Sequence, residues 1–357
     1  MASLEETINN INPLHEIAMK QARERQDQLT KPRGSLGRLE SIAVRVAGIT
    51  GRPLPVIEQS AIITMAADHG VVDEGVSLYP QEVTRQMVLN FLSGNAAVNI
   101  LADLACARTV TVDMGVKGGF LPTPGLICRM IDFGTRNMCK GPAMTREQAV
   151  DCLQAGIDVV EDQIKHGLEI VGTGDMGIGN TTAASAIMAA IAGVPPSQVT
   201  GRGTGINDGQ LDHKVRIIET ALKVNNPDPT DPLDVLSRVG GFEIGGLAGV
   251  MLGAASHRIP VVIDGFISGA AALVATGLCP GVKEYLFASH LSAENGHRIC
   301  LEHLGLQPIL NLEMRLGEGT GAALGIFLVR SAVLLLTRMK TFAEAAVSDI
   351  PHTEGAK

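Results

Sequence analysis

Apolar residues follow one another in short, unbroken runs at several places along the chain. The clearest run covers residues 61–67 and leads into Asp68-His69-Gly70. Unbroken apolar runs of this length are typical of strands that are covered on both faces. Shorter or weaker runs lead into glycine turns at 109–113, 169–172, 199–203 and 260–264. Each of these runs is expected to form a strand.

Most of the glycine turns are followed by a segment with helical character. Strand, glycine turn and helix in repeated succession are typical of an α/β fold, and here they predict a mainly parallel, Rossmann-like sheet flanked by helices. Ligands of such sheets bind beyond the carboxyl ends of the strands, where the turns collect. We therefore expect the active site at that edge.

Helix-like patterns also occur at both ends of the chain. In the polar segment 3–28, apolar residues recur at helical spacing, and Pro13 is expected to divide it, with Asn12 as the N-cap of the second helix. Ser35 is the expected N-cap of another helix that runs to about Gly48.

A long apolar run, 322–336, predicts a further helix near the end of the chain. We expect residues 1–50 and about 330–350 to form a small helical domain. The remaining residues, 51–329, are expected to form the α/β domain.

Composition and charge narrow the class of protein. The net charge is −8, no block is rich in Lys and Arg, and aromatic residues make up only 3%, so a nucleic-acid partner is not expected. The first ten residues lack the pattern of a secretory signal, and the apolar runs near 183–194 and 322–336 are shorter than a membrane span or broken by glycine. The six cysteines include no CxxC pair. We expect a soluble cytoplasmic enzyme that acts on small molecules.

A glycine-rich stretch, Gly172 to Thr182, follows a predicted strand and opens an Ala-rich helix. Its free backbone amides, its threonine hydroxyls and the helix N-terminus suit an anion such as phosphate. The stretch matches neither the dinucleotide nor the P-loop fingerprint, which favours a monophosphate. Lys214 follows a second glycine turn and would neutralise the phosphate. The alternatives are a turn needed only for packing and a solvated lysine.

Glu318 lies among the glycines of Arg315-Leu316-Gly317-Glu318-Gly319-Thr320-Gly321. Glycines let the backbone approach a ligand closely, so Glu318 is expected on a tight loop; an incidental acid on a surface loop is the alternative. A glutamate acts as a general base if burial raises its pKa. No metal-binding spacing is present, His69 is expected to be a hydrogen-bonded loop residue, and no metal or cofactor is expected. This combination fits transfer of a sugar phosphate.

Taken together, these stretches resemble the nicotinate-nucleotide:dimethylbenzimidazole phosphoribosyltransferases of cobalamin nucleotide-loop assembly. The matching motifs occur in the family's order over almost the whole chain: KPRGSLGRLE (31–40), AADHGVVDEGV (66–76), GNAAVNILA (94–102), GTGDMGIGNTT (172–182), VGGFEIGGLAGVMLGAA (239–255), VIDGF (262–266), SHLSAE (289–294) and MRLGEGTGAA (314–323).

The resemblance implies a reaction and roles for particular residues. Nicotinate mononucleotide would donate its 5-phosphoribosyl group to a nitrogen of dimethylbenzimidazole with inversion, releasing nicotinate. Glu318 matches the family's catalytic glutamate, which accepts the proton of the azole, and Asp175 matches a second acidic residue near the ribose. The residues carried over for phosphate and ribose are Gly177, Asn180, Thr181, Lys214 and Ser292.

The base pocket is where this sequence differs from the family's usual pattern. Tyr79, Met87 and Met176 are expected to face the aromatic acceptor, and they would favour apolar packing with one phenol hydroxyl. We hypothesise a relaxed choice of base that extends to phenolic acceptors such as p-cresol, with the chain as one subunit of a paired enzyme. Ordinary core contacts are the alternative for these three residues. The resemblance also implies a dimer, with an identical partner or a paralogue, and a non-catalytic nucleotide-binding subunit is the rival interpretation.

Overall fold

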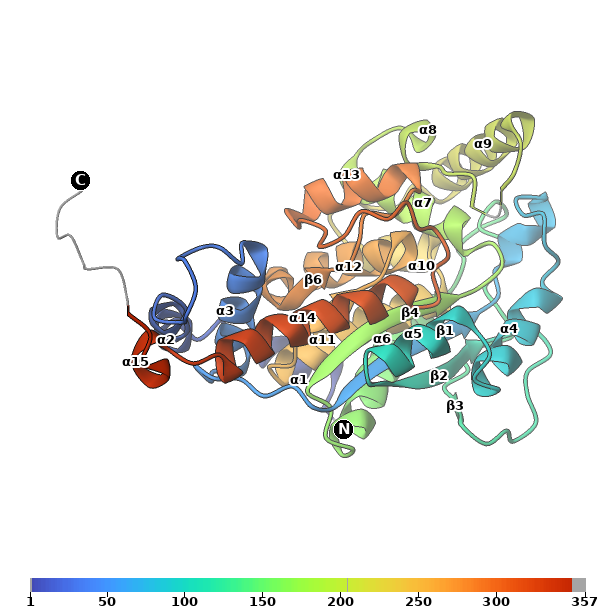
Figure 1. The fold of residues 1–357 in the computed structure, drawn as a ribbon. Helices are drawn as coiled ribbons and strands as arrows, with labels where there is room; N and C mark the ends of the chain where they lie inside the picture. Colours follow the sequence, from blue (N-terminus) through green and yellow to red (C-terminus); the bar gives the residue numbers. More distant parts are fainter. Residues whose placement is uncertain (1, 204, 349–357) are drawn as a thin grey trace. The chain divides into compact units, whose positions relative to one another are not determined.

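The computed structural model describes residues 2–203 and 205–348. The terminal residues from Asp349, which the sequence suggests are frayed, lie outside this range. The described chain forms a six-stranded sheet with helices on both sides (Figure 1).

All neighbouring strands of the sheet run parallel, in the order β3-β2-β1-β4-β5-β6. The strands are β1 (Ser60–Ala67), β2 (Ala107–Gly115), β3 (Leu126–Cys128), β4 (Ile170–Met176), β5 (Val261–Ile263) and β6 (Leu286–Ala288). The prediction of a mainly parallel α/β sheet is therefore confirmed. The chain crosses from one side of β1 to the other between β3 and β4. A crevice opens at such a switch point beyond the carboxyl ends of the strands.

One predicted strand is wrong, and two strands were not foreseen. The run 199–203 does not pair with the sheet; it follows the short helix α8 (Pro196–Val199). Pro196 at the first helical position favours that turn, and Thr200 closes it by donating a 2.6 Å hydrogen bond from its hydroxyl to the carbonyl of Pro196. The missed strands, β3 and β6, have only three residues each.

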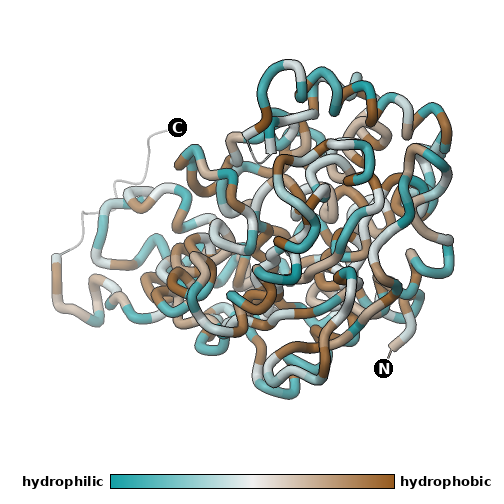
Figure 2. Tube along the Cα trace, turned by 90° about the vertical axis from the view of Figure 1, so that its right-hand side faces the viewer, coloured by the Kyte–Doolittle hydropathy of each residue, from teal (hydrophilic) through white to brown (hydrophobic). Residues whose placement is uncertain are grey.

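Buried helices cover both faces of the sheet. A Cβ on Gly246 of α11 (Phe242–Ser256) would clash with Met65 of β1, whereas a Cβ on Gly172 of β4 would lie 3.0 Å from Ala322 and 3.3 Å from Ile62. Neighbouring residues of a strand point to opposite faces, so Met65 and Ile62 mark the two faces, with α11 on one and the start of α14 (Thr320–Arg338) on the other. Figure 2 shows hydrophobic stretches, in brown, alternating with hydrophilic ones, in teal, along the chain.

Helices follow most of the glycine turns, as expected from the sequence. Their bounds are α1 (Leu4–Asn9), α4 (Glu82–Leu92), α5 (Ala97–Leu104), α6 (Arg146–Ile164), α7 (Asn180–Ala192), α9 (Asp208–Asn225), α10 (Pro232–Val239), α11 (Phe242–Ser256), α12 (Phe266–Leu278), α13 (Asn295–Leu304) and α14 (Thr320–Arg338), with 3-10 helices η1 (Gly70–Glu74) and η2 (Pro280–Tyr285).

The two predicted N-caps of the first helices are wrong. Helix α2 (Glu16–Gln26) is capped by His15, whose Nδ1 accepts from the backbone N–H of Ala18 at 3.3 Å. Asn12 instead donates from its side chain to the carbonyl of Asn10. Helix α3 (Arg38–Thr50) begins after Gly37, because the positive φ of Gly37 (54°) interrupts the chain between Ser35 and the first helical turn.

The chain divides into two compact units. The first contains the residues up to Pro13 and Glu58–Phe327, and the second contains Leu14–Ile57 and the residues from Leu328 onward. Within the second unit the guanidinium of Arg25 donates to the carbonyls of Leu336 and Met339, which joins the N-terminal and C-terminal segments. The second unit also contains α15 (Phe342–Ala345). That its helices act as a separate domain stays a prediction.

Two stretches are long and apolar enough to cross a membrane by length and composition alone, Glu82–Leu104 and Thr320–Arg338. The second is α14, which at 19 residues is longer than the apolar run 322–336 suggests. In its most apolar window 56% of the residues are buried inside the protein. Such burial is what a core helix of a globular fold shows.

Candidate active site

Every site residue predicted from the sequence lines a single pocket of about 420 Å³ at the carboxyl edge of the sheet. The predicted lining residues are Tyr79, Met87, Asp175, Met176, Gly177, Asn180, Thr181, Lys214, Ser292 and Glu318. Asp175 and Met176 end β4, and the others come from the loops and helices that follow β1, β4 and β6. The structure therefore brings them together, and their individual roles stay predictions.

The backbone of Glu318 is held on the sheet by two hydrogen bonds. The hydroxyl of Thr64 in β1 donates to the Glu318 carbonyl at 2.9 Å, and the Glu318 N–H donates to the carbonyl of Asp175 in β4 at 3.2 Å. A Cβ on Gly174 would clash with the Glu318 carbonyl, so β4 needs glycine at this point. The loop that carries Glu318 thus lies directly on the ends of β1 and β4.

Glu318 has a left-handed backbone conformation, with φ at 66°, between Gly317 (83°) and Gly319 (100°). A non-glycine residue in this conformation costs about 1–2 kcal/mol, so the surrounding structure must enforce it. The two backbone hydrogen bonds to the sheet supply part of that constraint. The Asp264 carboxylate adds to this constraint by accepting a hydrogen bond from the N–H of Gly319, the next residue.

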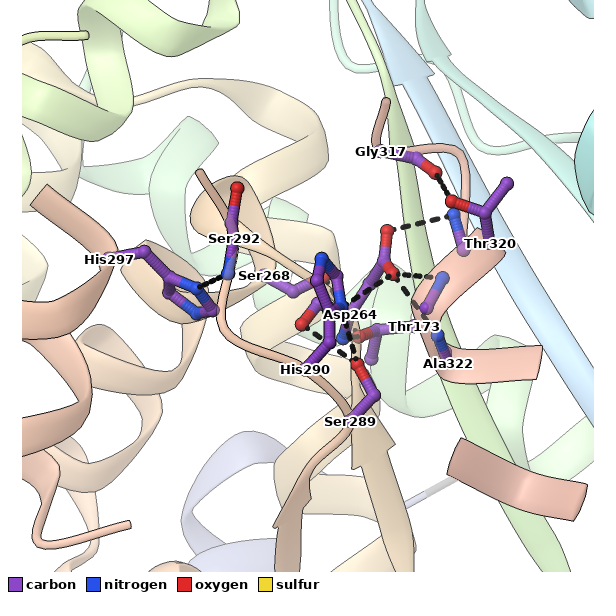
Figure 3. A network of polar contacts seen from close by, with 12 residues as sticks. Thr173, Asp264, Ser268, Ser289, His290, Ser292, His297, Gly317, Thr320 and Ala322 are labelled. Carbon is purple, nitrogen blue, oxygen red and sulfur yellow. Dashed lines mark hydrogen bonds and ion pairs between the residues drawn. The ribbon is translucent and has the colours of Figure 1, made fainter. Parts of the chain in front are cut away.

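Asp264 follows β5 and caps the N-terminus of α14 (Figure 3). One carboxylate oxygen accepts from the backbone N–H groups of Gly321 at 2.7 Å and Ala322 at 3.1 Å, and the other accepts from Gly319 at 3.0 Å. These amides have no partner within the helix itself, and the N-terminal end of a helix favours negative charge. Burial, opposed by the three amides and assisted by Glu318, raises the pKa of Asp264 to about 7.

The carboxyl group of Glu318 is arranged to accept a proton. Its side chain is buried, and burial raises its pKa above the ordinary value, although a backbone hydrogen bond from Val98 opposes this shift. Its Oε2 atom is buried and has no hydrogen-bond partner among the described residues. An unpartnered buried acceptor beside a pocket is chemically available to a bound ligand.

Asp175 lies next to this loop at the end of β4. Its Oδ2 accepts a 2.9 Å hydrogen bond from the side-chain amide of Asn180, the first residue of α7. Burial and the nearby carboxylates of Asp264, Glu243 and Glu318 raise the pKa of Asp175 well above its ordinary value, against the Asn180 hydrogen bond. Two acidic side chains of the pocket are therefore shifted toward neutrality.

A polar cluster of Thr181, Gly203 and Lys214 forms another part of the pocket wall. The Nζ atom of Lys214 donates to the hydroxyl of Thr181 at 2.7 Å, and a Cβ on Gly203 would lie 3.5 Å from the same Nζ. Lys214 is buried, which lowers its pKa to about 8, while Glu294 works in the opposite direction. A buried ammonium, a hydroxyl and the first turn of α7 form a suitable phosphate site.

Ser292 lies on the loop after β6, beside two histidines (Figure 3). Its backbone N–H donates to Nδ1 of His297 at 2.9 Å, and its hydroxyl accepts from the N–H of Glu294 at 3.3 Å. Ser292 therefore caps this turn, and it also lines the pocket. Burial, with His290 nearby, lowers the pKa of His297 to about 3, which keeps that ring neutral.

The three residues expected to face the base differ in burial. The ring of Tyr79 is 53% exposed, whereas Met87 and Met176 are half-buried. Met176 also packs against a buried cluster of Ala66, Val88 and Val116. Met176 therefore makes core contacts and also lines the pocket, and its contact with the base stays a prediction.

A buried pair supports the glycine loop after β4. His69 and Glu243 are in contact at 2.8 Å, and both side chains are buried. Burial lowers the pKa of His69, but the Glu243 carboxylate and Asp68 outweigh it, so the pKa is raised overall. The expectation that His69 is a hydrogen-bonded loop residue is confirmed. A Cβ on Gly177 would lie 3.4 Å from its Nε2 atom, so the ring forms the floor of that loop.

Sequence reasoning missed other parts of the site. Arg315, Glu294 and His290 also line the pocket, and Arg315 donates to the carbonyl of Gly203 at 2.8 Å. All three lie inside the sequence motifs that resemble the family, and those motifs could have identified them as site residues. Within residues 2–203 and 205–348, no three His, Cys, Asp or Glu side chains gather in an arrangement that would hold a metal ion.

Comparisons with known proteins agree over nearly the full length. A family model for phosphoribosyltransferases matches residues 11–347. The nicotinate-nucleotide–dimethylbenzimidazole phosphoribosyltransferase of Desulforudis audaxviator is 56% identical over 348 residues, which covers 98% of this chain and 99% of the relative. The enzyme of the same name from Geobacter metallireducens is 58% identical over 347 residues, 97% and 98% of the two chains.

A solved structure shows the same fold. The crystal structure of CobT from Thermus thermophilus superposes with a TM-score of 0.90 at 48% sequence identity, covering 93% of this chain and 99% of that one. The chain therefore belongs to the nicotinate-nucleotide–dimethylbenzimidazole phosphoribosyltransferase family.

Proposed function

We propose that this protein transfers the 5-phosphoribosyl group of nicotinate mononucleotide to 5,6-dimethylbenzimidazole, releasing nicotinate and forming α-ribazole phosphate. The observation that carries the proposal is Glu318, a buried carboxylate with one unpartnered oxygen, held on a fixed loop beside a pocket that also contains a buried lysine. The names of relatives at 56–58% identity support the same reaction.

In the proposed step, one ring nitrogen of the azole attacks the anomeric carbon of the ribose with its lone pair. The bond between that carbon and the pyridinium nitrogen breaks, and its electron pair returns to the nicotinate ring. The proton on the other azole nitrogen passes to Oε2 of Glu318. A carboxylate whose pKa is raised by burial is better matched to this proton than an ordinary surface glutamate.

The phosphate is proposed to bind Thr181 and Lys214, together with the backbone N–H of Gly177 and the side-chain amide of Asn180. The backbone N–H of Asn180 already donates to the carbonyl of Gly177, and one hydrogen of its side-chain amide is bonded to Asp175. An ammonium that is buried before the ligand arrives gains strongly from a dianion, because little water screens their attraction. Asp175 and Ser292 are proposed to hold the ribose hydroxyls. Asp175 is suited to this because Asn180 already orients its carboxyl group.

The aromatic acceptor is proposed to lie against Tyr79, Met87 and Met176. The relatives carry names that specify dimethylbenzimidazole, and none of the reported comparisons supports a phenolic acceptor or a non-catalytic partner subunit. Dimethylbenzimidazole is therefore the proposed base. We further propose a soluble cytoplasmic enzyme that works as a dimer and needs no cofactor.

The test is an assay with nicotinate mononucleotide and equal concentrations of dimethylbenzimidazole and p-cresol, with products identified by mass spectrometry. We expect α-ribazole phosphate as the main product and nicotinate in equal amount. Release of nicotinate without any ribosylated azole would contradict the proposal.

A further inference from the structure

A second pocket of about 480 Å³ opens at the same edge of the sheet and shares no lining residue with the first. Its walls come from η1, from the residue after β2, from the turn before α4 and from the loop that follows β3. The lining residues are Gly70, Asp73, Gln81, Lys117, Phe133, Gly134, Thr135, Arg136, Asn137, Lys140, Gly141 and Pro142.

The lining of this second pocket is positively charged. Lys117, Arg136 and Lys140 face a single acid, Asp73, in a protein whose net charge is −8. Among the described residues, none of the three cations forms an ion pair; Lys117 donates to Gln81 at 3.2 Å, and Arg136 reaches Gln148 only at 3.5 Å. Three cations and one acid give the lining of this concavity a net positive charge, which attracts an anion.

The walls are fixed by backbone hydrogen bonds. The N–H of Gly70 donates to the carbonyl of Thr135 at 3.0 Å, and the N–H of Thr135 donates to the carbonyl of Asp68 at 2.9 Å. The N–H of Arg136 is held by the carbonyl of Ala143 at 2.8 Å. The side chain of Gln81 spans the pocket edge, because its amide also donates to the carbonyl of His69 at 2.9 Å. The loop that carries Arg136 is therefore set before any ligand binds, which lowers the entropy cost of binding.

We propose that this second pocket binds a small phosphate monoester. An arginine and two lysines suit a phosphate dianion, with the planar guanidinium able to donate twice. The side-chain amides of Gln81 and Asn137 each make one donor and one acceptor contact within the protein, and each has one further N–H and one further lone pair for the hydroxyls of an attached sugar. The exposed Phe133 offers an apolar surface in the lining. The volume lies within the usual range for small-molecule sites.

Equilibrium titration with ribose 5-phosphate, which carries the phosphate and the sugar but cannot react, tests the proposal. The pocket variant Arg136→Gln/Lys140→Gln is compared with Arg23→Gln/Lys223→Gln, which removes the same charge from exposed positions elsewhere. We expect the pocket variant to lose one equivalent of bound ligand, or to bind it at least tenfold more weakly, while the control binds like the wild type.

Two further titrations separate this site from the active site and identify the ligand class. Lys214→Met is expected to keep the equivalent that the pocket variant loses. Ribose without phosphate is expected not to bind at the second pocket, whereas inorganic phosphate competes there. The proposal is overturned if the pocket variant binds as much ligand as the wild type, or if the lost equivalent disappears with Lys214→Met instead.

Discussion

The hydroxyl of Thr64 donates a 2.9 Å hydrogen bond to the backbone carbonyl of Glu318, a residue 254 positions further along the chain. This bond fixes the backbone of the proposed base from the central strand, independently of its carboxyl group. A change to the carboxyl alone therefore leaves the position of the loop intact. Substitutions at Glu318 accordingly report on proton transfer.

Glu318→Gln should lower kcat by roughly 10²–10⁴-fold, because an amide of nearly the same shape cannot accept the azole proton. The KM for nicotinate mononucleotide should change little, since the phosphate cluster is untouched. Initial-rate kinetics with dimethylbenzimidazole measure both. Glu313→Gln, an exposed glutamate on the same segment, is the matched control and should behave like the wild type. A variant with normal turnover at 318 would remove Glu318 from its role.

Asp264→Asn tests whether the cap of α14 positions Glu318. One half of the new amide is a donor, and it would oppose either the N–H of Gly319 or those of Gly321 and Ala322. We expect kcat to fall by about tenfold or more with little change in KM for the phosphate donor. Thermal unfolding shows whether the fold survives, and Asp103→Asn at an exposed position is the control. Asp264→Glu should restore part of the rate if the capping charge is what matters; equal losses in the two variants would argue against it.

The pH dependence of kcat/KM should show an acid limb set by Glu318. Its carboxylate is the active form, and burial raises its pKa above the ordinary 4.5. Activity is therefore complete above the raised pKa and is lost as the pH falls through it. The midpoint should lie above 4.5, and this limb should be absent from the residual activity of Glu318→Gln. A midpoint at or below 4.5 would show that burial does not tune this group.

Lys214→Met should raise the KM for nicotinate mononucleotide roughly 10- to 100-fold, the range expected for losing a charged hydrogen bond. The apolar chain is nearly kept, so the fold should tolerate the change. Because the pKa of Lys214 is lowered to about 8 in the free enzyme, the wild-type KM should also rise as the pH passes that value. Lys223→Met, in the exposed last turn of the same helix, should leave KM unchanged. An unchanged KM in Lys214→Met would show that the phosphate does not bind at Lys214.

The parallel sheet could be predicted because its central strands leave a clear pattern. β1 has eight consecutive buried residues, and apart from Ser60 and Thr64 all of them are apolar. β3 and β6 each contribute three residues, too few for any periodicity, and only pairing with a neighbour makes them strands. The run 199–203 misled because Val199 and the glycine turn after it resemble the end of a strand, while Pro196 directs the chain into a helical turn.

The site residues came together because loops at the carboxyl edge of a parallel sheet converge there. Which of them support the others could not be predicted. The contacts of Asp264 with the start of α14 join residues 55 to 58 positions apart, and nothing in the local sequence marks the carboxylate as a helix cap. In the sequence, Thr64 likewise looks like an ordinary threonine of a strand, and nothing near it indicates its hydrogen bond to Glu318. Such long-range pairs appear only when the fold is known.

The left-handed backbone of Glu318 sets a trade-off between the thermodynamic stability of the fold and the rate of turnover. Glycine tolerates that conformation without strain, so Glu318→Gly should raise the free energy of unfolding by about 1 kcal/mol while abolishing transfer. Loss of a buried carboxylate adds to the gain at neutral pH, and that part should vanish below pH 4.5, where the unfolded chain also carries the proton. Selection for heat resistance alone would therefore drive this position toward glycine, and the glutamate persists only where its chemistry is required.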